Sequence, residues 1–478
     1  MSTTLSDTAP PERHTGSGRS GSDRAEEARR ALEKAFEIAL AQIDGEIALP
    51  RRGDSTPERL HEELGIAIDP RGATFDEVAA KLRRILAETP SPASPLFFNQ
   101  LFGGRDPIAV IAEMLTPLTN TSMYTYKVAG PQVLVEREVL ARLAAKVGFA
   151  GGEGSLSPGS SLASLTAMLI ARNEAVGGAR ERGLGGQKLT VYTSADGHYS
   201  IRKAAGILGL GRDNVRQIET DGRGRMRVAA LEAALARDLA AGHRPILINA
   251  TAGTTVLGAF DPIAEIAELA SAHGVWLNID GALGGSVVLS ERHRHLVEGA
   301  ERADSYVWNA HKMMSVPLSC SALLLARQGL LERHLGEAAD YLFQSEADEL
   351  DPGRRSLQCG RRNDALKLWA AWQLHGDRGY EERIDRMFEL ADHLASRIEA
   401  DPELELVMRP QSINVCFEVP GRPSAAICER LDDEGRLLIG HGEANGRRAI
   451  RLVCVNPDLG ESDLEAALAE IKRTAAEL

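Results

Sequence analysis

The stretch Val275-Trp-Leu-Asn-Ile-Asp280-Gly-Ala-Leu-Gly-Gly285 decides the fold class of this sequence. Its apolar residues predict a buried strand, which ends in a carboxylate followed by small residues. Ligands of open α/β sheets bind at the carboxyl ends of the strands, which is where Asp280 lies. An aspartate in this position also commonly caps a turn or a helix, so Asp280 alone leaves both interpretations open.

A second stretch, Ser305-Tyr-Val-Trp-Asn-Ala-His311-Lys312, places a lysine immediately after another apolar strand. A lysine at a strand end is usually an exposed charge. Beside a carbonyl cofactor, however, its amine can form a Schiff base. If both strands belong to one sheet, the carboxylate of Asp280 and the amine of Lys312 can contact different parts of one bound ring.

Two further polar segments suit the same ligand. Ser157-Pro-Gly159-Ser160-Ser161 precedes an apolar helix, whose first N–H groups and hydroxyls can bind phosphate, although such residues also form an ordinary N-cap. Asp196-Gly-His198 follows a predicted strand, where an imidazole can stack on an aromatic cofactor. A lone loop histidine is more often unrelated to a ligand.

Strand candidates alternate with longer helical stretches from about residue 105 onward, which predicts an α/β domain with a largely parallel sheet. We divide the chain into a disordered tail (residues 1–23), an N-terminal helical segment (24–104), a large cofactor-binding domain (105–375) and a small C-terminal α+β domain (376–478). The predicted strands are 189–194, 245–251, 275–280, 305–310, 321–326, 404–409, 413–419 and 449–455, and the predicted helices include 24–43, 424–434 and 462–477.

The composition disfavours several classes of protein. Hydrophobic residues make up 43% of the 478 residues and charged residues 26%, and no apolar run reaches the roughly 18 residues of a membrane span. The first residues lack the apolar stretch of a signal peptide, so we expect a cytoplasmic protein with no membrane partner. The net charge of −13 disfavours nucleic acid as a partner.

The cysteines indicate neither a metal site nor a disulfide framework. They are five in number, scattered, and without the CxxC pairing that is typical of zinc ligands. We therefore expect no metal and mostly buried free thiols. These residues are Cys320, Cys359, Cys416, Cys428 and Cys454.

Together, these segments resemble the group II amino acid decarboxylases that depend on pyridoxal 5′-phosphate (PLP), in particular the glutamate and cysteine-sulfinate decarboxylase branch. Matching motifs occur in order along most of the chain, which is specific for the superfamily and much less specific for the substrate. They are Phe97-Phe-Asn-Gln-Leu101, Thr119-Asn-Thr-Ser-Met-Tyr-Thr-Tyr126, Ser157-Pro-Gly159, His198-Tyr-Ser, Asn249-Ala-Thr-Ala-Gly-Thr-Thr255, Gly258-Ala-Phe-Asp-Pro262, Asn309-Ala-His-Lys-Met-Met314 and Leu357-Gln-Cys-Gly-Arg361. The resemblance implies a homodimeric fold-type-I PLP enzyme.

The resemblance also assigns roles to individual residues. It makes Lys312 the Schiff-base lysine, Asp280 the partner of the pyridine nitrogen, and His198 the residue stacked on the ring. Other positions match neighbours of the ring or of the phosphate: Thr255 and Ala282 for the ring, and Ser160, Ser161, Asn309 and His311 for the phosphate.

Two more positions match residues that contact the substrate in this family. Arg451 matches the arginine associated with a substrate carboxylate, for which a bidentate guanidinium is well shaped. Gln100 matches a side-chain-recognition position of the glutamate branch. The implied reaction is decarboxylation of a small L-amino acid through a quinonoid carbanion, with glutamate, aspartate and cysteine sulfinate as candidate substrates.

The sequence departs from the family pattern in three places. Asp280-Gly-Ala-Leu replaces Asp-Ala-Ala-aromatic, Ala310 replaces a proline, and residues 343–355 form a shortened loop without the tyrosine that assists protonation in related enzymes. Tyr341 lies just before that loop. Two alternatives therefore stay open: decarboxylation-linked oxidative deamination, elimination or other carbanion chemistry, and a catalytically silent PLP-binding or partner-binding protein.

Overall fold

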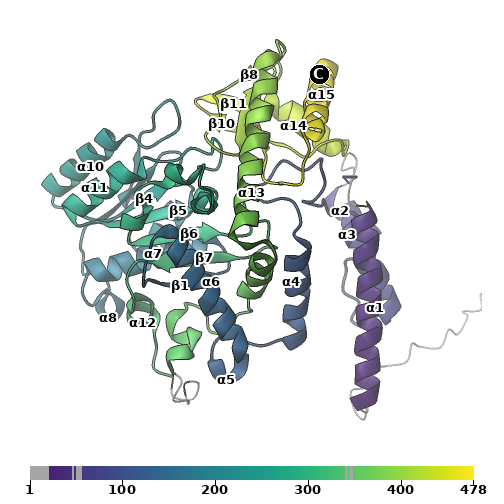
Figure 1. Cartoon of the computed structure of the whole chain (residues 1–478), viewed down its shortest axis with the longest axis horizontal. Coiled ribbons are helices and arrows are strands. Elements are labelled where there is room, and N and C mark those ends of the chain that lie inside the picture. The colour runs from purple at the N-terminus through teal and green to yellow at the C-terminus, as the bar shows by residue number, and fades with distance from the viewer. Residues whose placement is uncertain (1–20, 46–47, 50–55, 340–342, 344–347) are drawn as a thin grey trace, which may run out of the picture.

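The computed structural model describes residues 21–45, 48–49, 56–339, 343 and 348–478. Seven strands form the central sheet in the order β1-β7-β6-β5-β4-β2-β3 (Figure 1). Strands β2 to β6 run parallel, and β7 is antiparallel to β6 and β1, which confirms the predicted, largely parallel sheet. The strands are β1 (Glu153–Ser157), β2 (Leu189–Ser194), β3 (Val215–Ile218), β4 (Arg244–Thr251), β5 (Trp276–Gly281), β6 (Ser305–Asn309) and β7 (Ser321–Leu325).

Helices cover both faces of this sheet (Figure 1). Trp276 and Val307 belong to the core beneath α7, whereas Leu277 and Ile279 belong to the core beneath α10 and α11. Because both faces are buried, the central strands are apolar along most of their length. The helices of this domain are α5 (Tyr126–Ala129), α6 (Pro131–Val147), α7 (Ser160–Ala175), α8 (Ala179–Arg182), α9 (Ser200–Ile207), α10 (Val228–Ala240), α11 (Ile263–His273) and α12 (Leu330–Leu335).

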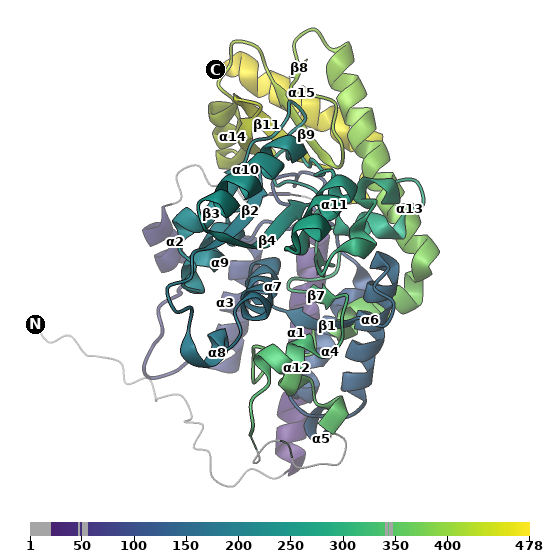
Figure 2. The same ribbon diagram turned by 90° about the vertical axis from the view of Figure 1, so that its left-hand side faces the viewer.

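The C-terminal part of the chain forms a second, smaller layer structure (Figure 2). Its antiparallel sheet has the order β10-β11-β9-β8, and α14 and α15 pack beside it. The predicted boundary at residues 375/376 falls inside α13, where Gly376 breaks the helical geometry with a φ of 64°. The elements are α13 (Ala365–Ala400), β8 (Glu405–Leu406), β9 (Asn414–Glu418), α14 (Ser424–Asp433), β10 (Gly440–Ala444), β11 (Arg447–Val453) and α15 (Glu461–Glu477).

The structure contains strands that the sequence patterns do not predict. β1 and β10 are short edge strands with the polar sequences Glu-Gly-Ser-Leu-Ser and Gly-His-Gly-Glu-Ala, and β3 is the other edge of the large sheet. Edge strands carry a weaker apolar pattern because one side of each is unpaired. β8 is also shorter than the predicted strand at 404–409.

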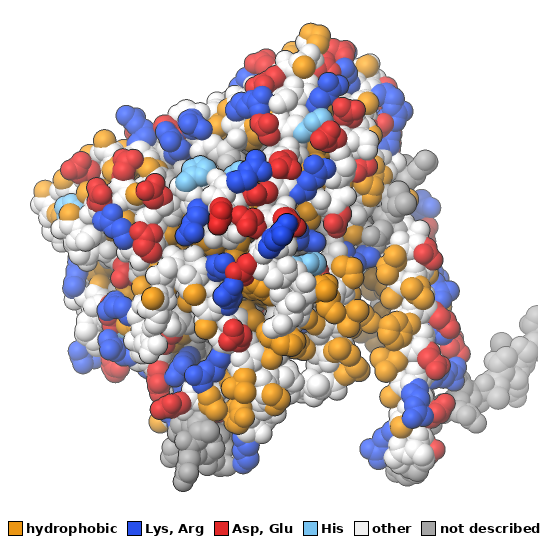
Figure 3. Space-filling model, viewed as in Figure 1, with side chains coloured by type: hydrophobic (Ala, Val, Ile, Leu, Met, Phe, Trp, Pro, Cys, Tyr) orange, Lys and Arg blue, Asp and Glu red, His pale blue; other side chains and the backbone are white. Residues whose placement is uncertain are grey.

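Four helices precede α5 among the described residues: α1 (Gly21–Gly45), α2 (Pro57–Glu63), α3 (Phe75–Ala87) and α4 (Pro107–Thr119). The helix predicted at 24–43 is thus confirmed, whereas most of the predicted tail lies outside the described residues. α1 packs against α3, beside the main body (Figure 1). Apolar side chains gather on the surface over α4 and α1 (Figure 3), and they include Leu32, Phe36, Leu40, Ile111, Leu115 and Leu118.

The segment between α3 and α4 joins the small sheet. Phe98 N–H donates to the Leu438 carbonyl at 2.8 Å, and the Phe98 carbonyl accepts the Val453 N–H at 3.1 Å. Leu438 N–H donates in turn to the Leu96 carbonyl at 2.9 Å. Residues 96–98 therefore extend the small domain, and they carry Asn99 and Gln100 to the side of β11.

Candidate active site

The carboxylate predicted to contact the ring lies at the end of β5. Asp280 is 5% exposed and pairs in register with Thr251 of β4 and Val307 of β6. The backbone N–H of Ala282 donates to Asp280 Oδ1 at 3.1 Å, so Ala282 lies directly against the carboxylate. Both residues occupy the carboxyl edge of the parallel strands, where ligands of such sheets bind.

Lys312 lies in the turn that follows β6, where its backbone N–H donates to the Asn309 carbonyl at 3.2 Å. Burial lowers the pKa of Lys312 below the usual lysine value, the charge of Asp280 opposes that change, and Arg451 adds to it. A lowered pKa increases the share of neutral amine, which is the nucleophilic form.

The pKa of His198 depends on the same neighbouring charges. Burial lowers its pKa, Asp280 acts in the opposite direction, and Lys312 lowers it further. The N–H of Ser200 donates to His198 Nδ1 at 3.3 Å, so the neutral ring carries its proton on Nε2. Because Asp280 acts on both His198 and Lys312, the structure brings the three predicted catalytic residues together.

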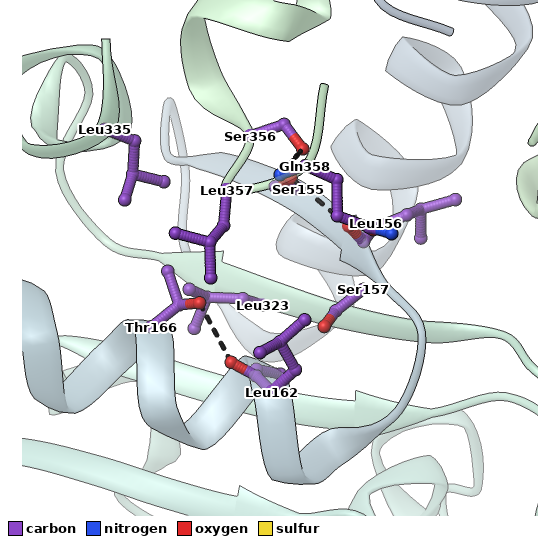
Figure 4. A pocket seen from close by; sticks show the side chains of 11 residues that line it. Ser155, Leu156, Ser157, Leu162, Thr166, Leu323, Leu335, Ser356, Leu357 and Gln358 are labelled. Atoms are coloured by element: carbon purple, nitrogen blue, oxygen red, sulfur yellow. Dashed lines mark hydrogen bonds between the residues drawn. The ribbon is translucent and has the colours of Figure 1, made fainter. Parts of the chain in front are cut away.

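The predicted phosphate-binding serines open α7. Ser160 is half-buried and Ser161 exposed, and no described side chain caps this end of the helix. A small hollow beside it is lined by residues that include Ser155, Ser157 and Gln358 (Figure 4). Its volume of about 20 Å³ holds roughly one water molecule, so it is too small for a cofactor.

His311 is held by the backbone of Cys320. Its Nδ1 lies 3.0 Å from the Cys320 nitrogen and 2.9 Å from the Cys320 carbonyl oxygen, so it accepts from the Cys320 N–H in one tautomer and donates to the Cys320 carbonyl in the other. Burial lowers the pKa of His311 to about 4, so the ring is neutral at physiological pH.

Asn309, the other residue predicted at the phosphate, ends β6 and is buried. Its Oδ1 atom has no hydrogen-bond partner among the described residues. Buried side-chain amides are normally satisfied, so a bound molecule or water is expected at this position.

Arg451 extends from β11 toward the large domain. Its two Nη atoms donate to the backbone carbonyls of Thr255, at 2.8 Å, and Asn99, at 2.5 Å. Its Nε is buried without a partner among the described residues, none of which forms an ion pair with this guanidinium. Gln100 is exposed, so within one chain the structure does not bring it into the group.

Described residues of the 343–355 loop, which contains no tyrosine, pack against the 119–126 motif. Phe343 stacks on Tyr124 with ring centroids 5.5 Å apart, and Gly353 N–H donates to the Tyr124 carbonyl at 2.8 Å. Asp351 Oδ1 accepts the Tyr126 N–H at 2.7 Å. Tyr341 and residues 344–347 lie outside the described residues.

Two asparagines of the site were missed by sequence reasoning. Asn99 contributes only its backbone carbonyl, which gives no signal in a sequence. Asn414 Nδ2 donates to the carbonyls of Thr255 and Val256 at 3.0 Å each, and so fixes the turn that Arg451 also contacts. Its partner turn is far away in the sequence, so no local pattern identifies it.

The described residues offer neither a metal site nor a membrane-spanning helix. Within the described ranges, no three His, Cys, Asp or Glu side chains gather closely enough to hold a metal ion. All five cysteines are free, and only Cys359 is exposed. None of the helices built from the described residues is both long and apolar enough to cross a membrane.

Comparison with known proteins identifies the family. Residues 57–420 match the pyridoxal-dependent decarboxylase conserved domain. Mouse cysteine sulfinic acid decarboxylase is 40% identical over 446 residues, which cover 88% of this chain and 90% of that protein. Mouse acidic amino acid decarboxylase GADL1 is 37% identical over 438 residues, covering 87% of this chain and 80% of that protein.

Solved structures agree with this assignment. The crystal structure of mouse CSAD in apo form superposes with a TM-score of 0.90 at 37% identity and covers 95% of this chain and all of that one. The structure of Oryza sativa TDC with PLP and tryptamine gives a TM-score of 0.86 at 26% identity, with 95% of this chain and 98% of that one covered.

The donor set also suits PLP, which offers an aldehyde, a ring nitrogen and a phosphate. The amine of Lys312 suits the aldehyde, the buried carboxylate of Asp280 suits a protonated ring nitrogen, and the uncapped start of α7 suits the phosphate. The chain therefore belongs to the pyridoxal-dependent decarboxylase family, and it is a PLP-dependent carboxy-lyase.

Proposed function

We propose that this enzyme decarboxylates a small L-amino acid that carries a second acid group, either a carboxylate or a sulfinate. The observation that carries the proposal is the environment of Arg451, a largely buried cation whose partners are neutral carbonyls of Thr255 and Asn99. A buried guanidinium without a carboxylate partner favours an anionic ligand. The names of the similar mouse enzymes, cysteine sulfinic acid decarboxylase and acidic amino acid decarboxylase, support the same substrate class.

The positions of the other residues support roles for them in holding the cofactor. Bound PLP supplies the electron sink for the carbon that loses carbon dioxide. Asp280 would keep the ring nitrogen protonated, and Lys312 would supply the amine that holds the cofactor aldehyde. His198, Thr255 and Ala282 would lie beside the ring.

The phosphate is held at the start of α7 and at the end of β6. Ser160 and Ser161 supply hydroxyl and backbone donors there. The Asn309 amide and the His311 imidazole would contact the phosphate from the end of β6.

The working unit in this proposal is a homodimer. Apolar side chains of α1 and α4, such as Phe36 at 58% and Leu115 at 50% exposure, gather on one surface (Figure 3), and exposed apolar patches of this kind mark interaction sites. A second copy covers that surface and also covers Gln100, which recognises the substrate side chain only in a closed pocket. The free thiols of all five cysteines support a location in the reducing cytoplasm.

A turnover screen tests this function. Purified enzyme with saturating PLP is incubated with glutamate, aspartate, cysteine sulfinate and a set of neutral and aromatic amino acids, in air and without oxygen, and every product is quantified by mass spectrometry. We expect one amine per carbon dioxide from the acidic substrates in both atmospheres. Exclusive turnover of neutral amino acids would contradict the substrate class, and aldehyde formed only in air would reveal oxidative deamination.

A further inference from the structure

Four buried side chains form a hydrogen-bonded ladder across the large sheet, one each from β2, β4, β5 and β6. Asn249 Nδ2 donates to Thr193 Oγ1 at 3.3 Å, and Asn278 Nδ2 donates to Asn249 Oδ1 at 2.7 Å. Ser305 Oγ donates to Asn278 Oδ1 at 2.7 Å. The four residues are at most 3% exposed, and each pairs in register with the next.

The bonds of the ladder run in one direction from its β6 end. Trp276 Nε1 donates to Ser305 Oγ at 2.8 Å, and an indole nitrogen can only donate. Ser305 donates its own proton to Asn278 Oδ1, and each asparagine amide then donates to the next residue. Thr193 Oγ1 accepts the last bond.

The ladder lies directly beneath the cofactor site. Asn249 and Asn278 each stand two residues before Thr251 and Asp280, so their side chains lie on the same face of the sheet. Thr251 and Asp280 are themselves register partners. The ladder is thus the row of side chains next to the row that contains the carboxylate predicted to contact the ring.

At its far end, the ladder supports the turn that carries His198. A Cβ atom on Gly197 would lie 2.8 Å from Thr193 Oγ1 and 3.6 Å from Thr251 Oγ1, so the glycine backbone rests on the Thr193 hydroxyl. Gly197 N–H donates to the Ser194 carbonyl at 2.9 Å. A side chain at position 197 would therefore require the Thr193 side chain or the turn itself to shift.

We propose that Thr193, Asn249, Asn278 and Ser305 are positioning residues that set the height of His198 above the sheet, and hence the gap between the imidazole and Asp280. The proposal rests on the proposed roles of His198 and Asp280. Backbone bonds fix the spacing of the strands and join Ala195 N–H to the Ile218 carbonyl and Gly197 N–H to the Ser194 carbonyl, whereas the Thr193 hydroxyl faces Gly197 from the side of the sheet. Four buried polar groups are a costly way to fill a core, and their directional bonds supply the positional constraint that apolar side chains lack.

Thr193→Val tests this proposal because valine keeps the shape of threonine and removes the hydroxyl. Thr190→Val is its matched control: Thr190 lies on the same strand, is also fully buried, and has a hydroxyl bonded to Tyr192 Oη at 2.9 Å on the opposite face. Thr193→Ser restores the hydroxyl. For each variant, kcat, KM, PLP occupancy and Tm are measured at saturating PLP.

We expect Thr193→Val to lower kcat about 10- to 100-fold, as a displaced active-site group does, with KM within about twofold and PLP occupancy unchanged. Thr193→Ser should recover most of the loss, and Thr190→Val should lower Tm by a comparable amount without changing kcat. Equal loss of kcat in both valine variants, or no loss in either, would overturn the ladder proposal.

A separate variant distinguishes this failure from failure of the proposed site. His198→Asn removes the imidazole itself. If it lowers kcat while Thr193→Val behaves like Thr190→Val, His198 is catalytic and the ladder does not position it. If His198→Asn has no effect, the proposed role of His198 fails, and the ladder proposal fails with it.

Discussion

Arg451 of the small sheet donates a 2.8 Å hydrogen bond to the backbone carbonyl of Thr255, in the turn that follows β4 of the large sheet. The guanidinium that we propose for the substrate acid is therefore fixed relative to the cofactor residues by a bond between the two domains. A residue of the small domain thus contributes to a site whose other members lie on the large one.

Arg451→Lys should raise KM for acidic substrates about tenfold, because an ammonium cannot reproduce the planar guanidinium that contacts both Thr255 and Asn99. PLP occupancy should stay close to that of the parent enzyme. Steady-state kinetics and cofactor absorbance check both points. Arg447→Lys, on the same strand but paired with Glu418 and Glu405, is the matched control. Loss of PLP with unchanged KM would refute the assignment.

Lys312→Ala should abolish covalent attachment of PLP. Borohydride reduction followed by peptide mass spectrometry should find the cofactor on the peptide that contains Lys312 in the parent enzyme, and on no peptide in the variant. Lys203→Ala, at an exposed lysine of α9, should retain the label. A label of normal stoichiometry on the Lys312→Ala protein would place the attachment elsewhere.

Asp280→Asn should weaken PLP binding and lower kcat by about 100-fold or more, since an amide cannot keep the ring nitrogen protonated. Titration of the apoenzyme with PLP and turnover at saturating PLP measure the two effects. Asp304→Asn serves as control because Asp304 accepts the Leu277 N–H at the opposite edge of the sheet. Normal affinity and turnover in Asp280→Asn would exclude the predicted contact.

Titration of His311 should contribute to the pH dependence of the free energy of unfolding. Its pKa is about 4 in the folded chain, and about 6.5 is usual for an unfolded one, so between these values the unfolded chain binds more protons. Stability is therefore lost as the pH falls through that window. His311→Asn keeps an acceptor for the Cys320 N–H without titrating. Its apoenzyme Tm should fall less between about pH 7 and about pH 5, whereas His273→Asn, at an exposed histidine, should match the parent.

Leu115→Asp should dissociate the proposed homodimer, because it places a charge on the exposed apolar face of α4. Light scattering should show the mass of one chain, and activity should fall with dimer content. Leu239→Asp changes a leucine of similar exposure on α10 and should remain dimeric. A monomeric parent enzyme with full activity would contradict the proposal.

The central part of the fold could be predicted because its strands are buried on both faces. β5 and β6 consist mainly of apolar residues, interrupted in β5 by Asn278, and the structure places each within a residue or two of the predicted bounds. β1 and β10 could not be predicted in the same way. Their strand conformation depends on pairing with β7 and β11, which are distant or polar partners, and their own residues have little strand preference.

The residues of the site also differ in whether local sequence identifies them. Asp280 and Lys312 could be recognised because each directly follows an apolar strand, so local sequence indicates both the element and the chemistry. Asn99 could not, since it acts through its backbone, and Asn249 could not, since its partners come from other strands. Gln100 remains a prediction that depends on a second copy.

The link between Phe98 and the strands of the small sheet has a consequence for biosynthesis. During translation, residues 96–98 emerge from the ribosome early, whereas their partners Leu438 and Val453 emerge only near the end. The backbone of this segment stays unpaired while the large domain collapses, and long-range contacts of this kind form slowly. The contacts that hold the Asn99 carbonyl beside Arg451 can therefore form only after the C-terminal strands have emerged, so they are among the last parts of the site to assemble.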